Sequence, residues 1–312
     1  MPELPGLPKA GALERRITGD GSPSFFSHTF QEAFHSQAGA RQEAEQKYVQ
    51  PAQLQRWQRG STIQVVDVGV GLGYNSAALA EAAGDLGLTL QWWGLELDSS
   101  PLPQALADAS FRRQWRPQTL ELLHQLTAQQ PNPTSAWCCA LGQGQLLWGD
   151  ARVRLPELLE QAEGQCHLVL LDAFSPRRCP QLWTLEFLTG LARLLAPEGR
   201  ILTYCSAAAV RQSLRQIGLE LAAIQGAEPG PEPAANPLWS MGTVASWQPL
   251  PLGGVLRALS PMEWDHLHTQ AAEPYRDPSQ TAEAPAILEA RRLAQAKSPA
   301  PSTSAWRRRW GT

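Results

Sequence analysis

Three glycines at alternating positions, Gly69, Gly71 and Gly73, follow an apolar run at residues 63–68 and precede an alanine-rich segment. The apolar run predicts a buried parallel strand, and the alanine-rich segment predicts a packed helix. Glycines let the backbone approach a ligand where a Cβ would collide, and the first N–H groups of the helix add a polar cradle. The spacing differs from the Gly-x-Gly-x-x-Gly dinucleotide fingerprint. It favours a nucleoside that carries an amino-acid tail, although glycine turns also serve plain strand-to-helix packing.

Acidic residues follow the next predicted strands. Glu96 can accept both hydroxyls of a ribose, or it can be a solvated residue at a strand end. Asp150 can receive the exocyclic amine of adenine, or it can cap the helix after it. Asp172 lies between a buried strand and a proline-containing loop, where a carboxylate can hold an amine and take up its proton if its pKa is shifted. We expect Asp67, inside the end of the first strand, to be structural and to bond backbone amides of the glycine loop.

Short apolar runs alternate with helical patterns over most of the chain. The predicted strands are 63–68, 88–95, 145–148, 168–171, 200–205 and 241–247, and the predicted helices are 76–83, 104–109, 119–129, 153–161, 182–195 and 208–217. This alternation predicts an α/β fold with a doubly wound, mostly parallel sheet. Ligands of such sheets bind beyond the carboxyl ends of the strands, which is where the acids fall.

Composition narrows the class of protein. The 312 residues carry a net charge of −3, so there is no global basic field, although a local basic face is compatible with this charge. Five cysteines form no Cys-x-x-Cys pair and fit reduced thiols better than a disulfide framework. The first residues lack the pattern of a signal peptide, and no apolar run approaches the roughly 20 residues that span a bilayer. We therefore expect a cytoplasmic protein without a membrane segment or a metal site.

The order of these features resembles a class I S-adenosylmethionine-dependent methyltransferase with a Rossmann-like fold: glycine loop, then Glu96, then Gly149-Asp150, then Asp172. Two stretches, 18–22 with 34–43 and 171–184, narrow the resemblance. The second contains Asp-x-Phe-x-Pro followed by Pro-x-x-Trp-Thr. Both look like the methyltransferase half of the bifunctional MnmC enzymes and their stand-alone MnmD relatives, which methylate the 5-aminomethyl group of (2-thio)uridine at the wobble position of tRNA. The resemblance runs from about residue 18 to 246.

The resemblance implies a role for individual residues. The donor, S-adenosyl-L-methionine, would be bound by Glu43, Gly69, Gly71, Gly73, Asn75, Glu96 and Asp150, and Asp172 would be the catalytic residue at the substrate amine. Phe174 and Trp183 would stack on the flipped uracil ring, or they are ordinary core residues. Arg177 and Arg178, with Arg41, Lys47, Arg56, Arg59 and the terminal arginines, would form a phosphate-binding face or a solvated set of scattered charges. For His35 we expect a hydrogen-bonded structural role.

The chain also departs from the family. A basic stretch expected near the last strand is replaced by residues 236–243, the glycine loop reads Val-Gly-Leu-Gly-Tyr-Asn, and the flavin-dependent oxidase half has no counterpart. We expect an N-terminal extension at 1–60 that contributes to the donor and substrate site, a methyltransferase domain at 61–250, and a partly disordered C-terminal extension at 251–312. No stable protein partner can be predicted. Two other hypotheses stay open: a methyltransferase for another RNA or a small amine, and a non-enzymatic module that binds a partner through its proline-rich loop, 227–237, and its Trp/Arg tail.

Overall fold

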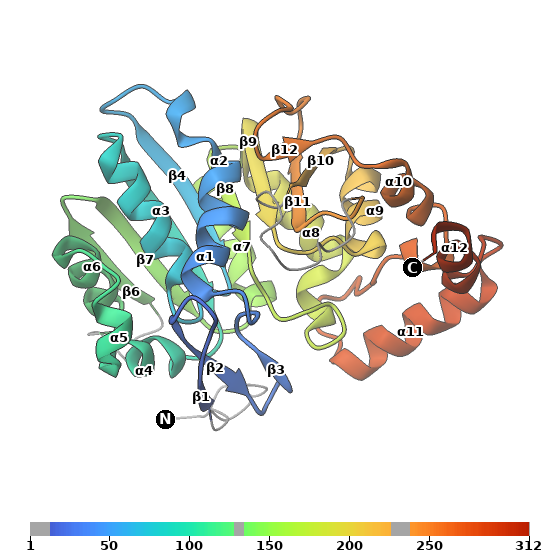
Figure 1. Ribbon diagram of the computed structural model, residues 1–312, viewed down its shortest axis with the longest axis horizontal. Coiled ribbons are helices and arrows are strands. Elements are labelled where there is room, and N and C mark those ends of the chain that lie inside the picture. Colours follow the sequence, from blue (N-terminus) through green and yellow to red (C-terminus); the bar gives the residue numbers. More distant parts are fainter. Residues whose placement is uncertain (1–12, 128–133, 226–237, 312) are drawn as a thin grey trace.

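The computed structural model describes residues 13–127, 134–225 and 238–311, so the proline-rich loop at 227–237 lies outside the described residues. A central sheet of nine strands runs through the described part of the chain (Figure 1). In spatial order its strands are β12 (Leu256–Arg257), β10 (Glu220–Ile224), β11 (Gly242–Ser246), β9 (Leu195–Thr203), β8 (Cys166–Leu171), β4 (Thr62–Val68), β5 (Thr89–Glu96), β7 (Gly142–Trp148) and β6 (Thr134–Cys139).

The pairing of the strands confirms the doubly wound, mostly parallel α/β fold. Strands β7, β5, β4, β8 and β9 pair in parallel, while β11 is antiparallel to both β9 and β10. The chain order reverses between β4 and β8, which makes this the switch point of the sheet. Residues 196–199 form an irregularity within β9.

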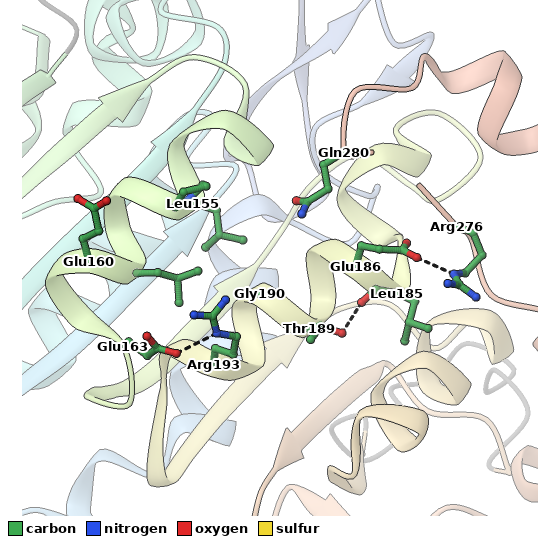
Figure 2. A pocket seen from close by; sticks show the side chains of 12 residues that line it. Leu155, Glu160, Glu163, Leu185, Glu186, Thr189, Gly190, Arg193, Arg276 and Gln280 are labelled. Carbon is green, nitrogen blue, oxygen red and sulfur yellow. Dashed lines mark hydrogen bonds and ion pairs between the residues drawn. The ribbon is translucent and has the colours of Figure 1, made fainter. Parts of the chain in front are cut away.

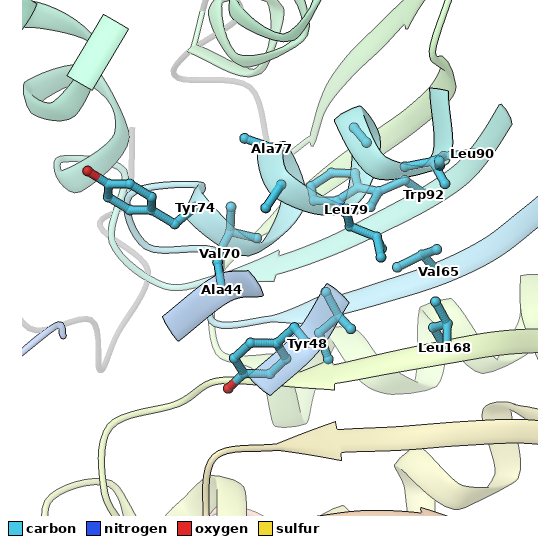
Figure 3. Close-up of a cluster of buried hydrophobic side chains, with 14 of the residues drawn as sticks. Ala44, Tyr48, Val65, Val70, Tyr74, Ala77, Leu79, Leu90, Trp92 and Leu168 are labelled. Atoms are coloured by element: carbon cyan, nitrogen blue, oxygen red, sulfur yellow. The ribbon is translucent and has the colours of Figure 1, made fainter. Parts of the chain in front are cut away.

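Both faces of the sheet are buried, because successive residues of a strand point to opposite faces. Val65, Leu90 and Leu168 pack in one cluster with Tyr48 and Leu79, as Figure 3 shows. Their strand neighbours, including Val66, Val169 and Leu171, pack in a second cluster with residues of the helices on the other face. This explains why the central strands read as continuous apolar runs rather than as alternating patterns.

Helices cover the two faces of the sheet. The first cluster involves α1 (Ala40–Ala44), η1 (Glu45–Val49), α3 (Tyr74–Asp85), α4 (Pro101–Ala107), α5 (Ala109–Arg112) and α6 (Pro117–Thr127). The second involves α7 (Ala151–Ala162), η3 (Pro180–Trp183), α8 (Leu185–Leu194) and α9 (Ala208–Ile217). Gly218 ends α9 in a left-handed conformation with φ of 100°. Within the described ranges, no helix has the length and apolar character needed to cross a membrane.

The N-terminal extension is a small sheet followed by helical turns. The three strands β1 (Leu13–Ile17), β2 (Pro23–Ser27) and β3 (Glu32–Ala33) are antiparallel. They lead into α1 and η1, and then into α2 (Gln50–Ala52) and η2 (Leu54–Arg56). The small sheet lies below the carboxyl ends of the central strands in Figure 1, and α1 lies in front of them. This arrangement places the extension next to the predicted donor and substrate site.

The C-terminal extension, expected to be partly disordered, is folded over residues 251–311. It adds β12 to the edge of the central sheet and continues into α10 (Pro261–His266), η4 (Gln270–Ala272), α11 (Ala284–Lys297) and α12 (Thr303–Trp310). Trp306 of α12 is buried, stacks on His266 and donates its indole N–H to the carbonyl of Met262 at 3.1 Å. The Trp/Arg tail is thus docked on α10 through its tryptophan.

Candidate functional site

The predicted acids and the glycine loop meet at one edge of the sheet. The N–H of Gly69 donates to the carbonyl of Leu95, and the N–H of Gly149 donates to the carbonyl of Glu96, at 2.9 and 2.8 Å. On the other side of β4, the N–H of Asp172 donates to the carbonyl of Val68 at 3.0 Å. The structure therefore brings together the ends of β4, β5, β7 and β8, beside the switch point of the sheet.

The glycines of the loop are required by the backbone. Gly69, Gly71 and Gly73 have φ angles of 83°, 55° and 84°, a region that residues with a Cβ rarely adopt. A Cβ on Gly69 would lie 2.9 Å from the carbonyl oxygen of Asp172, and a Cβ on Gly71 would lie 3.3 Å from the ring of Phe34. The sequence suggested space for a ligand at these positions. Backbone conformation and close packing against protein atoms account for them directly.

Glu96 holds the glycine loop from the end of β5. Its two carboxylate oxygens accept the N–H groups of Gly71 and Asp98, each at 2.8 Å. Burial raises the pKa of Glu96, and these backbone hydrogen bonds lower it again in part. Because each oxygen keeps a further lone pair, the carboxylate can also accept the hydroxyls of a ribose.

Asp150 caps α7, which is the alternative role considered for it. Its side chain accepts the N–H of Arg152 at 2.9 Å and the guanidinium of the same residue through Nε and Nη2. About a third of the Asp150 side chain is exposed (34%), so the carboxylate also faces outward. A contact with an adenine amine stays a prediction, and it is compatible with the cap.

Asp172 is held by two neighbours with hydrogen-bond donors. The amide of Asn75, in the first turn of α3, donates to its Oδ2 at 2.6 Å. Burial raises the pKa of Asp172 to about 6, and the hydrogen bonds from Tyr48 and Asn75 oppose this rise. The carboxylate therefore titrates close to neutral pH, in the range where it can exchange a proton with an amine.

Glu43 and Lys47 form an ion pair on the helical segment that faces Asp172. The Lys47 ammonium donates to the Glu43 carboxylate at 2.9 Å, and both side chains are largely buried. Burial opposes the ionisation of Glu43, but Lys47 and the N–H of Ser36 bring its pKa below the ordinary value. Both charges also act on the pKa of Asp172, Glu43 raising it and Lys47 lowering it. This ion pair offers one charge of each sign beside the glycine loop.

His35 has the structural environment that we expected. Its Nδ1 lies 2.9 Å from the hydroxyl of Ser24, and its ring packs edge-on against Tyr74. Burial lowers the pKa of His35 to about 4, so the imidazole is neutral at physiological pH.

The aromatic residues of the 171–184 loop are packed against protein. Trp183 is fully buried, donates its indole N–H to the carbonyl of Phe174 at 2.8 Å and meets Tyr204 edge-on. Phe174 is half-buried and stacks on Phe30 with ring centroids 4.4 Å apart. Trp183 thus has the environment of a core residue that fixes the loop, while Phe174 stays partly accessible. Arg177 and Arg178 follow on the same loop and are exposed.

Asp67 has a different partner from the one expected. The carboxylate is fully buried and accepts the hydroxyl of Ser76, in α3, instead of backbone amides of the glycine loop. Burial raises its pKa to about 7.

Sequence reasoning missed Tyr48 and Arg152, which contact the predicted acids Asp172 and Asp150, and it missed Asp277, which contacts Arg152. The spacing of Arg152 two residues after a helix cap was a visible signal, whereas no local pattern links it to Asp277. An open depression of about 630 Å³ lies elsewhere, between α7, α8 and residues 276–280, as Figure 2 shows. It contains none of the predicted site residues.

Comparisons with known proteins show similarity to methyltransferases. Residues 119–228 match the model of a family described as S-adenosyl-L-methionine-dependent methyltransferase. The chain is 28% identical over 254 residues, 75% of its length, to the tRNA 5-methylaminomethyl-2-thiouridine biosynthesis bifunctional protein MnmC of Cupriavidus necator. It is 25% identical over 223 residues, 66% of its length, to the protein of the same name from Paraburkholderia xenovorans. These matches cover 34% and 32% of the relatives, so the chain spans about a third of their length.

A solved structure extends the match to almost the whole chain. The crystal structure of MNMC2 from Aquifex aeolicus superposes with a TM-score of 0.75 at 27% sequence identity. The alignment covers 93% of this chain and 87% of that one. It therefore includes most of both extensions as well as the central sheet.

The donor set fits S-adenosyl-L-methionine, the cofactor that this family uses. Glu96 has spare acceptor capacity for a ribose, Asp150 is partly exposed, and the Glu43–Lys47 pair complements the ammonium and carboxylate groups of an amino-acid tail. These findings support an S-adenosyl-L-methionine-dependent methyltransferase that is similar to the methyltransferase domains of MnmC proteins.

Proposed function

We propose that this protein methylates the 5-aminomethyl group of (2-thio)uridine at the wobble position of tRNA. The observation that carries the proposal is the position of Asp172. A carboxylate with a pKa of about 6 ends the strand next to the glycine loop, and Asn75 of the helix after that loop holds it. The names of the two bifunctional relatives support a tRNA acceptor. Such a substrate also implies a cytoplasmic enzyme.

The reaction requires a neutral amine in line with the methyl group. When bound, S-adenosyl-L-methionine supplies a methyl group on a positively charged sulfur, which is already activated. The N–C bond forms as the C–S bond breaks, and sulfur keeps the electron pair. An alkylammonium substrate must first lose a proton, for which Asp172 is the acceptor, directly or through water. Orientation by Asp172 and Asn75 supplies the rest of the rate enhancement.

Lys47 favours the neutral form of the amine. Its ammonium interacts with Asp172 and lies 5.9 Å from the centre of the Tyr204 ring. A second cation in this region is disfavoured by like-charge repulsion, so a substrate amine is more easily deprotonated there.

The donor would lie along the strand ends from Glu43 to Asp150. In this proposal Glu96 accepts the ribose hydroxyls, Asp150 accepts the adenine amine, and Glu43 binds the amino group of the methionine tail. Gly69, Gly71, Gly73 and Asn75 form the turn beneath it. Phe174 is the remaining aromatic candidate for stacking on the uracil ring, because Trp183 is enclosed by the core.

Arg177 and Arg178 are the best-placed cations for the tRNA backbone. Both are exposed on the loop that begins at Asp172. Arg41 and Lys47 are instead engaged in ion pairs, and Arg56 stacks on Trp57. The phosphate-binding face would therefore be local, which is compatible with a net charge of −3.

The proposal is tested by methyl transfer to defined acceptors. The purified protein is incubated with S-adenosyl-L-methionine and tRNA that carries 5-aminomethyl-(2-thio)uridine, and the digested nucleosides are analysed by mass spectrometry. We expect a mass increase of one methyl group on that nucleoside, and none on matched tRNA lacking the aminomethyl group. Transfer to a panel of small amines but not to the tRNA would contradict the proposal and favour the small-amine hypothesis.

A further inference from the structure

Arg152 holds Asp150 with more contacts than a helix cap needs. The guanidinium binds the carboxylate side-on through Nε and Nη2, with the Nη2 contact at 2.7 Å, in addition to the backbone N–H of the same residue. Only 8% of the Arg152 side chain is exposed, against 34% for Asp150. A side-on pair of this kind fixes the plane of a carboxylate as well as its position.

The C-terminal extension in turn holds Arg152. The Nη1 of Arg152 donates to Asp277 at 3.0 Å and to the carbonyl of Ala282 at 2.8 Å. Asp277 is almost fully buried and also accepts from Ser279 and from the N–H of Ala282. The buried guanidinium of Arg152 thus donates four N–H groups. Two bind Asp150, after the end of β7, and two bind the segment that contains Asp277, 125 residues further along the chain.

The segment around Asp277 is fixed against α8 as well. The N–H of Leu185 donates to the carbonyl of Tyr275, and Glu186 accepts from the N–H of Asp277 and from the side chain of Arg276. Figure 2 shows Arg276 and Gln280 on the chain segment that lies close to α7 and α8. These contacts fix the position of the Asp277 carboxylate, to which Arg152 donates.

We infer that Arg152, held by Asp277, positions Asp150 to accept the exocyclic amine of the donor's adenine. Asp277 and the carbonyl of Ala282, both in the C-terminal extension, thereby complete the donor site. A carboxylate has about four lone-pair positions, and three N–H groups of Arg152 take up the inner ones. The lone pair that remains free to accept a hydrogen bond lies on the exposed side of the Asp150 carboxylate. This inference rests on the proposed adenine role of Asp150, and it is independent of the methyl acceptor.

The test compares two ligands by calorimetry, so it needs no methyl transfer. One is S-adenosylhomocysteine and the other is its 6-deamino analogue, in which a hydrogen replaces the adenine amine. A hydrogen bond from this amine to a carboxylate predicts that the wild-type protein binds the analogue roughly 10- to 100-fold more weakly. We expect Asp150→Asn to reduce this ratio to within about threefold.

The positioning role is tested by the double variant Arg152→Met with Asp277→Asn and by Asp277→Asn alone. The double variant removes both charges of the buried Arg152–Asp277 pair and leaves only the partly exposed carboxylate of Asp150 without its partner, which favours a folded protein. We expect both variants to lower the ligand ratio, the double variant to that of Asp150→Asn. Arg276→Met is the matched control, because it removes an ion pair of the same segment that does not contact Arg152. Its ligand ratio should equal that of the wild type.

The possible results separate the claims. A wild-type ratio in the double variant, with a reduced ratio in Asp150→Asn, would overturn the positioning role and leave Asp150 at the amine. A wild-type ratio in Asp150→Asn would overturn the inference as a whole. Failure to methylate the tRNA would refute the proposed acceptor, whereas the ligand ratios would still decide this inference.

Discussion

Replacing Glu263 with glutamine should strongly destabilise the folded C-terminal extension. Glu263 of α10 is buried, and its oxygens accept four donors: the Arg211 and Arg257 side chains and the N–H groups of Ser240 and Ser260. Glutamine offers one acceptor oxygen, so two of these contacts are lost and Arg211 becomes a buried cation without a counter-charge. Breaking a buried ion pair from one side typically costs about 3–5 kcal/mol, and we expect about 4 kcal/mol here.

The assay is urea unfolding of the variant and the wild type at pH 7. The exposed ion pair between Glu289 and Arg292 on α11 supplies the control, because Glu289→Gln should change the free energy of unfolding by no more than about 0.5 kcal/mol. A loss of less than about 1 kcal/mol for Glu263→Gln would refute the reasoning, because removing one partner of a buried pair leaves the other charge uncompensated.

The contribution of Glu263 to the free energy of unfolding should depend on pH. Burial opposes ionisation, but Arg257 and Arg211 bring the pKa of Glu263 down to about 2 in the folded protein. A folded pKa below the unfolded value gives stability that is present above about pH 4.5 and is lost as the pH falls toward 2. The difference between the variant and the wild type should therefore narrow between pH 5 and pH 3.

Three further predictions concern the strand ends. Burial raises the pKa of Asp67 from an ordinary value of 3.8 to about 7. The free energy of unfolding of the wild type, relative to that of Asp67→Asn, should therefore fall by on the order of 4 kcal/mol as the pH rises from about 4 to 7. Urea unfolding at several pH values measures this difference, and a difference that does not change with pH would contradict the prediction. Gly69→Ala should lower the free energy of unfolding by about 1–3 kcal/mol and slow methyl transfer, because the added Cβ would contact the Asp172 carbonyl at a positive φ. A thermal unfolding temperature equal to that of the wild type would show that the substitution causes no strain. The kcat/KM for methyl transfer should include a rise through about pH 6 from ionisation of Asp172, and a profile without this step would exclude Asp172 as the proton acceptor.

The central sheet could be predicted because its strands are buried on both faces. Continuous apolar runs predicted β4, β5, β8 and β9 within a few residues. Strands β6 and β10, which lie toward the two ends of the sheet, were not predicted. β6 alternates buried and exposed residues over only six positions and contains two cysteines, and β10 follows α9 after a single turn. Their pairing depends on neighbours that no local pattern reveals.

The acids of the site could be predicted because they end strands, while their partners could not. Glu96 and Asp172 lie next to the glycine loop as their order along the chain implied. The Arg152–Asp277 contact joins residues 125 positions apart, and the folded tail depends on Trp306 packing against His266. Proline and alanine content suggested disorder for the extension. Tertiary packing of its tryptophan and the buried charges of α10 account for its order instead.

The most direct test of the account is single-turnover methyl transfer by Asp172→Asn on tRNA that carries 5-aminomethyl-(2-thio)uridine, with donor binding measured on the same preparation. Asparagine keeps the size of the side chain but cannot accept the proton of an ammonium. We predict S-adenosylhomocysteine affinity within about threefold of the wild type, together with a methyl-transfer rate lower by roughly 100-fold or more. A variant that transfers the methyl group at the wild-type rate would contradict the claim that Asp172 orients and deprotonates the amine.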